Sequence, residues 1–220
     1  MASMYETIME LPLFKGIGEE QLSQMLEKTS IEFLRFEDGD VIANEFARVN
    51  SVDFILSGRI RNTFRLENFP IEIDEILGVG AMVGALHLFG LDTTYGSSAT
   101  ALGKVSIMRV EKSQYMKILQ SDGIYILNFV NYLSAAAQKG SRIQLQLGAF
   151  SIGRQIKTLT ESVVSRAAES VVIAASDHAL ADFCGVSVPE FRDWKSAELA
   201  HNRIIVNQRG ILIKSPRLLR

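Results

Sequence analysis

The chain of 220 residues has the composition of an ordinary globular protein, with 47% hydrophobic and 22% charged residues. Its one cysteine, Cys184, excludes an internal disulfide and any zinc or iron–sulfur site that needs several cysteines. No apolar run reaches the roughly 18 residues that span a bilayer. The N-terminus is acidic where a signal peptide would be basic. We therefore expect a cytoplasmic protein with no membrane partner.

The net charge of −2 is unevenly distributed along the chain. After position 150 there are ten basic and seven acidic residues, and the last 18 residues hold five basic residues and no acidic one. A basic end on an acidic protein favours contact with a polyanion. A solvated basic surface with no partner is the alternative.

Short helices are predicted for the first 30 residues, and short strands for the region from Ile31 to about Val110. The strands are separated by turn signals such as "EDGD" and Ser57-Gly58. Strands that are so short and so evenly punctuated predict an antiparallel β-roll or jelly roll, and no helix of crossover length supports a Rossmann domain. The predicted fold class is α+β, with a sensor roll and its N-terminal helices over 1–120.

A long helix is predicted over 121–150, because apolar or small residues recur there at steps of three and four. These seam positions are Ile126, Phe129, Leu133, Ala136, Gly140, Ile143 and Leu147. Heptad spacing of this kind favours a dimer seam between two copies of the chain. The alternative is one amphipathic helix packed on its own roll.

The region 151–220 is predicted to form a helix-turn-helix followed by a β-hairpin wing. Ser176 and Ser187 are helix N-caps, and Gly185 is the left-handed residue between the two helices. The stretch "RIIVNQRGILIK" predicts a hairpin with Gly210 at its turn. An ordinary helical hairpin beside an unrelated β-hairpin is the alternative.

The order of β-roll, long helix and C-terminal winged helix resembles the CRP/FNR family of bacterial transcription regulators over nearly the whole chain. The local matches are "FEDGDVI", "FILSGRIRN", "GVGAMVGALHLF" and "GAFSIGRQIKTL". The resemblance implies a roll like a cyclic-nucleotide-binding domain, a homodimer, and double-stranded DNA as partner. RNA polymerase and a small-molecule effector are its further candidate partners. We expect no enzyme, because no catalytic motif accompanies the resemblance.

The resemblance also places an effector pocket in the roll. Its residues are Gly84, Ala85, Leu86, Ser97, Ser98 and Ala99. Family members that bind cyclic nucleotides carry a glutamate for the ribose and an arginine for the phosphate in these two stretches, and both are absent here. An unpaired buried phosphate costs several kcal/mol, on the order of a thousandfold in affinity. We expect neither cyclic AMP nor cyclic GMP, no cofactor and no metal site. His87 is the one candidate haem ligand, and simple packing is its alternative.

The helix after Ser187 corresponds in the resemblance to the DNA-reading helix. The predicted DNA-contacting residues are Ser187, Val188, Glu190, Arg192, Lys195, Arg203 and Arg209. Val188 and Pro189 cannot donate a hydrogen bond to guanine, and Asp193 brings the wrong charge toward phosphates. We therefore expect phosphate-led binding to an operator unlike the common one of the family. The alternative is a ligand-binding or interaction module whose winged helix no longer reads DNA, with Arg192 and Lys195 as solvated charges.

Overall fold

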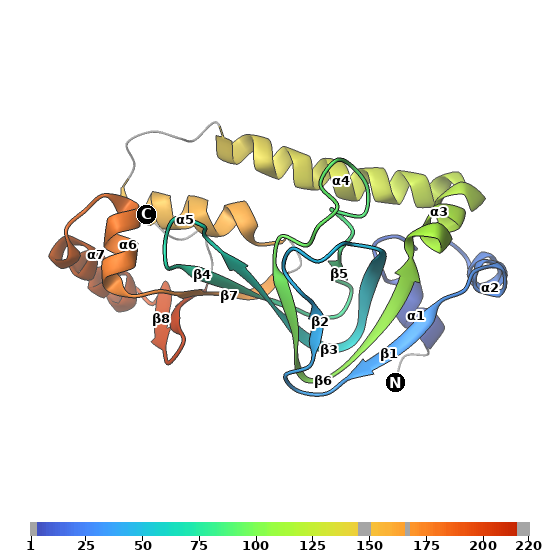
Figure 1. Cartoon of the computed structure of the whole chain (residues 1–220), viewed down its shortest axis with the longest axis horizontal. Helices are drawn as coiled ribbons and strands as arrows, with labels where there is room; N and C mark the ends of the chain where they lie inside the picture. The colour runs from blue at the N-terminus through green and yellow to red at the C-terminus, as the bar shows by residue number, and fades with distance from the viewer. Residues whose placement is uncertain (1–3, 145–150, 166–167, 215–220) are drawn as a thin grey trace. The chain divides into compact units, whose positions relative to one another are not determined.

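The computed structural model describes residues 4–144, 151–165 and 168–214, and the chain divides into two compact units (Figure 1). The first unit contains residues 1–60 and 77–138, and the second contains residues 61–76 and 139–220. Within the described ranges, no helix combines the length and apolarity needed to cross a membrane.

The first unit is built around an antiparallel β-roll. Its strands are β1 (Glu32–Phe36), β2 (Val41–Ala43), the first part of β3 (Ser51–Arg65), β5 (Met82–Val83) and β6 (Ser98–Glu111). Strand β6 pairs with both β1 and β2, and β3 pairs with β5. The predicted α+β class with an antiparallel roll is confirmed.

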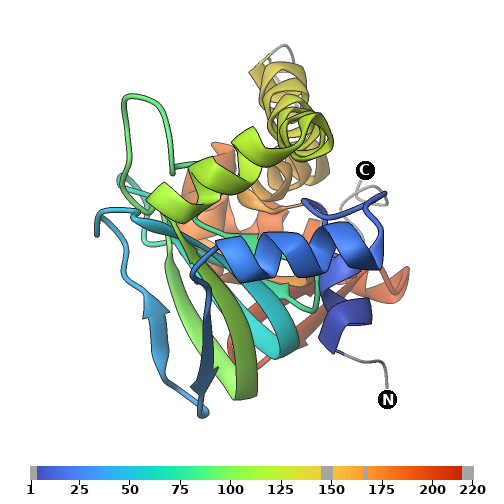
Figure 2. The ribbon, with the colours of Figure 1, turned by 90° about the vertical axis from the view of Figure 1, so that its right-hand side faces the viewer.

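Four helices cover one face of this roll (Figure 2). They are α1 (Met4–Met9), α2 (Glu19–Lys28), α3 (Lys112–Ser121) and α4 (Gly123–Gln144). Their apolar side chains share one core with alternate residues of the strands, and the ring of Phe14 lies 5.7 Å from that of Phe54 on β3. Because side chains alternate along a strand, the neighbours of Phe54 face the other side of the sheet.

The second unit joins a winged helix to the hairpin between β3 and β4. Its other elements are β4 (Glu72–Leu77), α5 (Ile152–Val163), β7 (Ala168–Ala174), α6 (Asp177–Cys184), α7 (Val188–Ala200), β8 (Ile204–Asn207) and β9 (Gly210–Ile213). The strand order is β3-β4-β7-β9-β8. Ile71 and Ile73 of the hairpin share a core with Ile156 of α5 and Phe191 of α7. The hairpin is thus packed as part of the winged-helix unit.

The structure differs from the sequence-based prediction in three places. The turn predicted at Ser57-Gly58 is absent, because β3 continues through it, and a Cβ on Gly58 would lie 2.3 Å from the Lys104 carbonyl oxygen of β6. Glycine there serves a close approach of two strands. Strand β7 was not predicted at all. The predicted boundary at 120 also does not separate the compact units, because residues 61–76 group with the C-terminal one.

Candidate functional site

The stretch from Gly78 to Gly90 forms the turn-rich cradle of the predicted effector pocket. Gly84 has φ +84°, and a Cβ there would lie 2.7 Å from the Ser51 carbonyl oxygen, so glycine is required. The His87 N–H donates to the Gly84 carbonyl oxygen at 3.1 Å and closes the turn. Ala85 is buried, whereas Leu86 is 48% exposed. The cradle therefore presents backbone and apolar side chains.

The second stretch of the predicted pocket leads into β6. The Ser98 hydroxyl accepts a hydrogen bond from the Glu45 N–H at 3.2 Å. Ala99 is fully buried and lies opposite Ala43 of β2, while Ser97 is half-buried. The hydroxyl of Ser98 thus joins two segments of the roll to each other.

An ion pair lies on the face of the roll that points away from the helices, and the sequence analysis missed it. Arg109 of β6 donates from Nε and Nη2 to the two carboxylate oxygens of Asp53 on β3, at 2.7 and 2.6 Å. Asp53 is fully buried. These hydrogen bonds raise the pKa of Arg109. Burial raises the pKa of the nearby Tyr95, and the negative charge of Asp53 adds to the rise.

The Asp53–Arg109 pair bears on whether Arg109 could replace the phosphate-binding arginine that the predicted pocket lacks. A buried carboxylate requires a partner. Asp53 within the apolar stretch "SVDFIL" could therefore have indicated a buried ion pair. Both carboxylate oxygens already hold the Arg109 guanidinium. Arg109 therefore does not offer an unmatched charge to an anionic ligand.

The helix-turn-helix has the local structure that its sequence predicts. The Ser176 hydroxyl accepts from the Ala179 N–H at 3.1 Å, and the Ser187 hydroxyl accepts from the Glu190 N–H at 3.4 Å. Gly185, with φ +67°, ends α6 in the left-handed conformation. Helix α7 therefore begins in a defined direction after a tight turn.

The residues of α7 are divided between the core and the surface. Glu190, Arg192 and Asp193 are exposed, whereas Phe191 is fully buried. Val188 is half-buried and packs against the core of the unit. Its predicted place among the DNA-contacting residues stays a prediction, and only the exposed part of its side chain is open to such a contact.

Every basic side chain predicted to contact DNA is paired with a carboxylate. Asp177, in the first turn of α6, accepts from Arg192 Nε at 3.1 Å and from Lys195. Arg203 Nη1 lies 2.9 Å from Glu198 Oε1, and Glu198 is buried. Arg209, in the turn of the wing, pairs with a carboxylate of β4 described below.

The helix-turn-helix itself is acidic. Residues 177–200 contain five carboxylates and only two basic side chains, Arg192 and Lys195. The hydrogen bond from Lys195, supported by Arg192, lowers the pKa of Asp177 below its ordinary value, so this carboxylate is ionised at neutral pH. Any polyanion that binds this surface must compete with carboxylates for its cations.

The seam predicted on α4 is only partly exposed. Phe129 is buried in its own unit, with its ring 5.4 Å from that of Tyr115, and Leu133 packs against the same core. Phe129 thus contributes to the core of its own unit, Leu133 is partly buried against it, and their place in a dimer seam stays a prediction. Ile126 is 47% exposed and Ala136 is half-buried. Two further residues that the prediction omitted, Leu127 and Val130, are 58% and 48% exposed.

The remaining seam positions are Gly140, Ile143 and Leu147. Gly140 and Ile143 belong to α4, but their side chains lie outside the described part of the structure, and Leu147 lies outside the described residues altogether.

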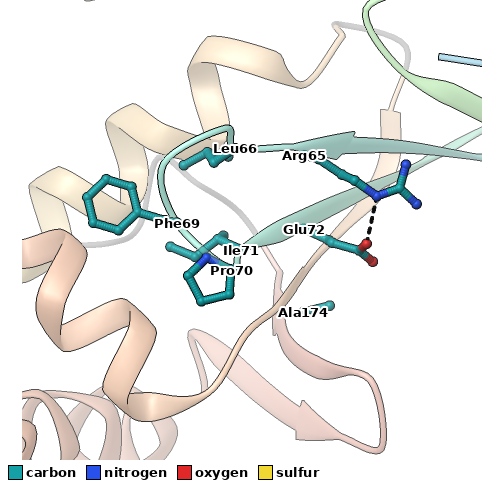
Figure 3. A pocket seen from close by; sticks show the side chains of 7 residues that line it. All are labelled: Arg65, Leu66, Phe69, Pro70, Ile71, Glu72 and Ala174. Carbon is teal, nitrogen blue, oxygen red and sulfur yellow. Dashed lines mark hydrogen bonds and ion pairs between the residues drawn. The ribbon is translucent and has the colours of Figure 1, made fainter. Parts of the chain in front are cut away.

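A pocket lies at the tip of the β3–β4 hairpin (Figure 3). It is lined by Arg65, Leu66, Phe69, Pro70, Ile71, Glu72 and Ala174. Arg65 Nε and Glu72 Oε1 lie 2.9 Å apart across the two strands, and both side chains are exposed. The ring of Phe69 packs edge-on against Phe183 of α6 at 5.3 Å. This contact fixes the hairpin tip against the helix-turn-helix.

Comparisons with known proteins agree on the fold. The family model described as "Cyclic nucleotide-binding domain" matches residues 33–122. No curated protein matches the chain in sequence. Among solved structures, the catabolite activator protein of Thermus thermophilus is similar, with a TM-score of 0.55, 16% identity, and coverage of 94% of this chain and 95% of that one.

Two further solved structures share the fold at low identity. The c-di-GMP-responsive global regulator CLP of Xanthomonas campestris has a TM-score of 0.50 and 14% identity, covering 90% of this chain and 100% of that one. FixK2 of Bradyrhizobium japonicum has a TM-score of 0.50 and 13% identity, covering 86% and 94%. Residues 33–122 are thus similar to the cyclic nucleotide-binding domain, and the chain shares its fold with these three solved structures.

Proposed function

We propose that the chain is a homodimeric transcription regulator that inserts α7 into the major groove of double-stranded DNA. One observation carries the proposal: α6 and α7 are both N-capped around a left-handed Gly185, and the β8–β9 hairpin follows as a wing. In winged helix-turn-helix proteins this arrangement presents the second helix to base edges.

The side chains proposed to contact base edges are Glu190 and Arg192, which are both exposed on α7. A glutamate accepts from the amino group of cytosine, and an arginine donates to O6 and N7 of guanine. Arg192 must leave Asp177 to do so, because Asp177 holds its Nε. The cations Lys195 and Arg203 serve phosphates, which position the protein without specifying sequence, and Arg209 does so once it leaves its carboxylate partner. Since each of them also has a carboxylate partner, we expect weak binding.

A second copy of the chain supplies the other half of the interface. Ile126, Leu127 and Val130 form an exposed apolar stretch of α4 that a partner helix can cover. A dimer of this kind places two α7 helices on half-sites about one DNA turn apart, roughly 34 Å. RNA polymerase as a further partner stays a prediction from the family resemblance.

The cradle is proposed to bind a small molecule other than cyclic AMP or cyclic GMP, or to have lost its ligand. From Gly78 to Ala99 the sequence offers only His87 and Asp92 as ionisable side chains apart from Tyr95. None of these side chains is an arginine or a lysine, so the stretch offers no permanent cation to a buried cyclic phosphate. The effector acts only through its different affinities for the two dimer states.

The test is a selection of random duplex DNA on the purified protein at low salt, with the bound sequences read out. We expect enrichment of a two-fold symmetric motif, unchanged by added cyclic AMP. The matched control is Arg192→Gln, which removes one base-reading group and leaves the helix caps intact. It should relax the motif at one position of each half-site. Retention without an enriched motif would contradict sequence reading by α7.

The second candidate is an interaction module whose winged helix does not bind DNA. The acidic balance of residues 177–200 favours it, because five carboxylates repel phosphates. The salt dependence of retention separates the two candidates. A steep loss of DNA affinity with added salt supports the regulator, and no retention even at low salt supports the interaction module.

A further inference from the structure

We propose that Asp74 of β4 acts as an internal substitute for a DNA phosphate and holds the wing arginine, Arg209, in an autoinhibitory contact. The inference rests on the DNA binding proposed above and specifies how it is restrained. Asp74 and Arg209 belong to the same compact unit: Asp74 lies on β4, Arg209 lies in the turn between β8 and β9, and β7 separates β4 from β9 in the sheet.

Asp74 is a buried carboxylate, with 1% of its surface exposed. The Thr63 hydroxyl donates to its Oδ1 at 2.6 Å. Arg209 Nη2 lies 2.9 Å from Oδ2, and Arg61 Nε lies 3.6 Å from the same oxygen. The carboxylate therefore gathers two guanidinium groups, one from its own hairpin and one from the wing.

The turn of the wing directs Arg209 to this place. The Asn207 side-chain oxygen accepts from the backbone N–H groups of both Arg209 and Gly210, at 2.9 and 3.0 Å. Gly210 passes so close to β7 that a Cβ would lie 2.0 Å from the Ile173 carbonyl oxygen. With the turn fixed and β9 pressed against β7, the Arg209 side chain extends toward β4.

The geometry around Asp74 allows Arg209 to leave the contact. Oδ2 of Asp74 meets its guanidinium partners without an aligned hydrogen bond among the residues that the structure describes. When Arg209 leaves, Asp74 keeps Thr63 and Arg61, so no buried charge is stranded. The Arg209 side chain is already 47% exposed and can turn outward without unfolding the wing.

Asp74 is also close in sequence to the cradle. Strand β4 ends at Leu77, and the chain enters the cradle at Gly78. The segment proposed to hold an effector therefore follows directly in sequence on the strand that carries Asp74. The proposed device makes the wing cation available to DNA only when its contact with Asp74 opens.

The experiment measures DNA affinity of the full chain by fluorescence anisotropy, with the duplex enriched in the selection above, across a series of salt concentrations. We expect Asp74→Asn to bind more tightly than the wild type. Its plot of log affinity against log salt should be steeper by about 0.9, the value for one added phosphate contact. Adding Arg209→Gln to Asp74→Asn should remove both gains.

Two single variants provide the controls. Glu72→Gln removes the same charge from the same strand, where Glu72 pairs with the exposed Arg65 (Figure 3), and should leave the affinity and slope as in the wild type. Arg209→Gln leaves Asp74 with Thr63 and Arg61, so it should fold even if Asp74→Asn does not. Because the wing arginine is held back, Arg209→Gln should keep the wild-type salt slope.

Three outcomes overturn the proposal. A wild-type slope for Asp74→Asn, or a slope reduced by about 0.9 in Arg209→Gln, would show that Arg209 is not withheld from DNA, while DNA binding itself stands. No binding by any variant at low salt would overturn the autoinhibition and the proposed function together.

Discussion

At the scale of single residues, Asp177 decides the charge that α7 presents. Its carboxylate accepts from Lys195 and Arg192, which lowers its pKa. A carboxylate with a lowered pKa stabilises the folded state fully above its ordinary pKa of about 3.9, and this stabilisation is lost as the pH falls through the lower folded value.

We therefore expect Asp177→Asn to lower the free energy of unfolding by about 1 kcal/mol at pH 7. The difference from the wild type should shrink as the pH is lowered from 5 toward 3. Urea unfolding followed by circular dichroism checks this result. The matched control is Asp182→Asn, since Asp182 is exposed on the same helix and contacts His178 alone among the ion pairs described. An equal loss at all pH values would contradict the role of ionised Asp177.

Residue-scale signals explain why the caps and the left-handed glycine were predictable while the ion pairs were not. Ser187 bonds to a residue three positions away, so its role is written in local sequence. Arg109 and Asp53 are 56 positions apart, and only the pairing of their strands brings them together. The same holds for Arg209 and Asp74. The sequence identified Arg209 as a candidate but not Arg109, and the fold determined the partners of both.

At the scale of elements, the pairing of β9 with β7 builds the platform on which the wing stands. Val172 lies opposite Leu212 in this ladder, and Gly210 sits where β9 approaches β7 most closely. Gly185, by contrast, has open space around its would-be Cβ. Gly210, with φ +149°, is therefore required for both steric and conformational reasons, whereas Gly185 is required for its conformation alone.

We expect Gly210→Ala to destabilise the protein by about 3 kcal/mol, because a methyl group would displace the Ile173 carbonyl and open the ladder. Gly185→Ala should cost only about 1–2 kcal/mol, the penalty for a left-handed residue with a Cβ. Thermal unfolding of both variants gives the comparison. Equal destabilisation would mean that β9 can shift away from β7 at little cost.

In helix α4, the periodic spacing of apolar residues predicts a helix. It does not tell which of these residues face the core and which remain exposed. The steps of three and four predicted one apolar seam, and the helix formed as predicted over Gly123–Gln144. Its apolar residues in fact serve two surfaces: Phe129 and Leu133 pack in the core, while Leu127 and Val130 are exposed. Both surfaces are apolar, so hydrophobicity alone could not separate them.

At the scale of the whole molecule, the exposed part of α4 is expected to hold two copies together. We predict that Val130→Asp converts a dimer into monomers in sedimentation equilibrium, since a carboxylate buried in an apolar seam has no partner. Gln120→Asp, which adds the same charge at an exposed position on α3, should remain dimeric. A monomeric wild type at micromolar concentration would rule out this seam.

The order of helices, roll, long helix and winged helix could be predicted from the sequence alone, because short-range sequence signals indicate each part. Turn glycines, N-caps and strand alternation act over a few residues, and the predicted α+β fold follows from their order along the chain. The absence of the cyclic-nucleotide glutamate and arginine was equally visible, because it is a matter of residue type at matched positions.

Only the tertiary structure decided which charged side chains pair and with which unit the β3–β4 hairpin packs. Nothing in residues 61–76 indicates that they pack with the winged helix of the C-terminal region, nor that Asp74 meets Arg209. Such contacts depend on which distant strands become neighbours, and many pairings satisfy the same local pattern. The sequence thus determined which elements this protein has. The tertiary structure decided which carboxylate each cation pairs with, and the position of β4 beside β7 did so for Arg209, because charge pairing follows spatial proximity.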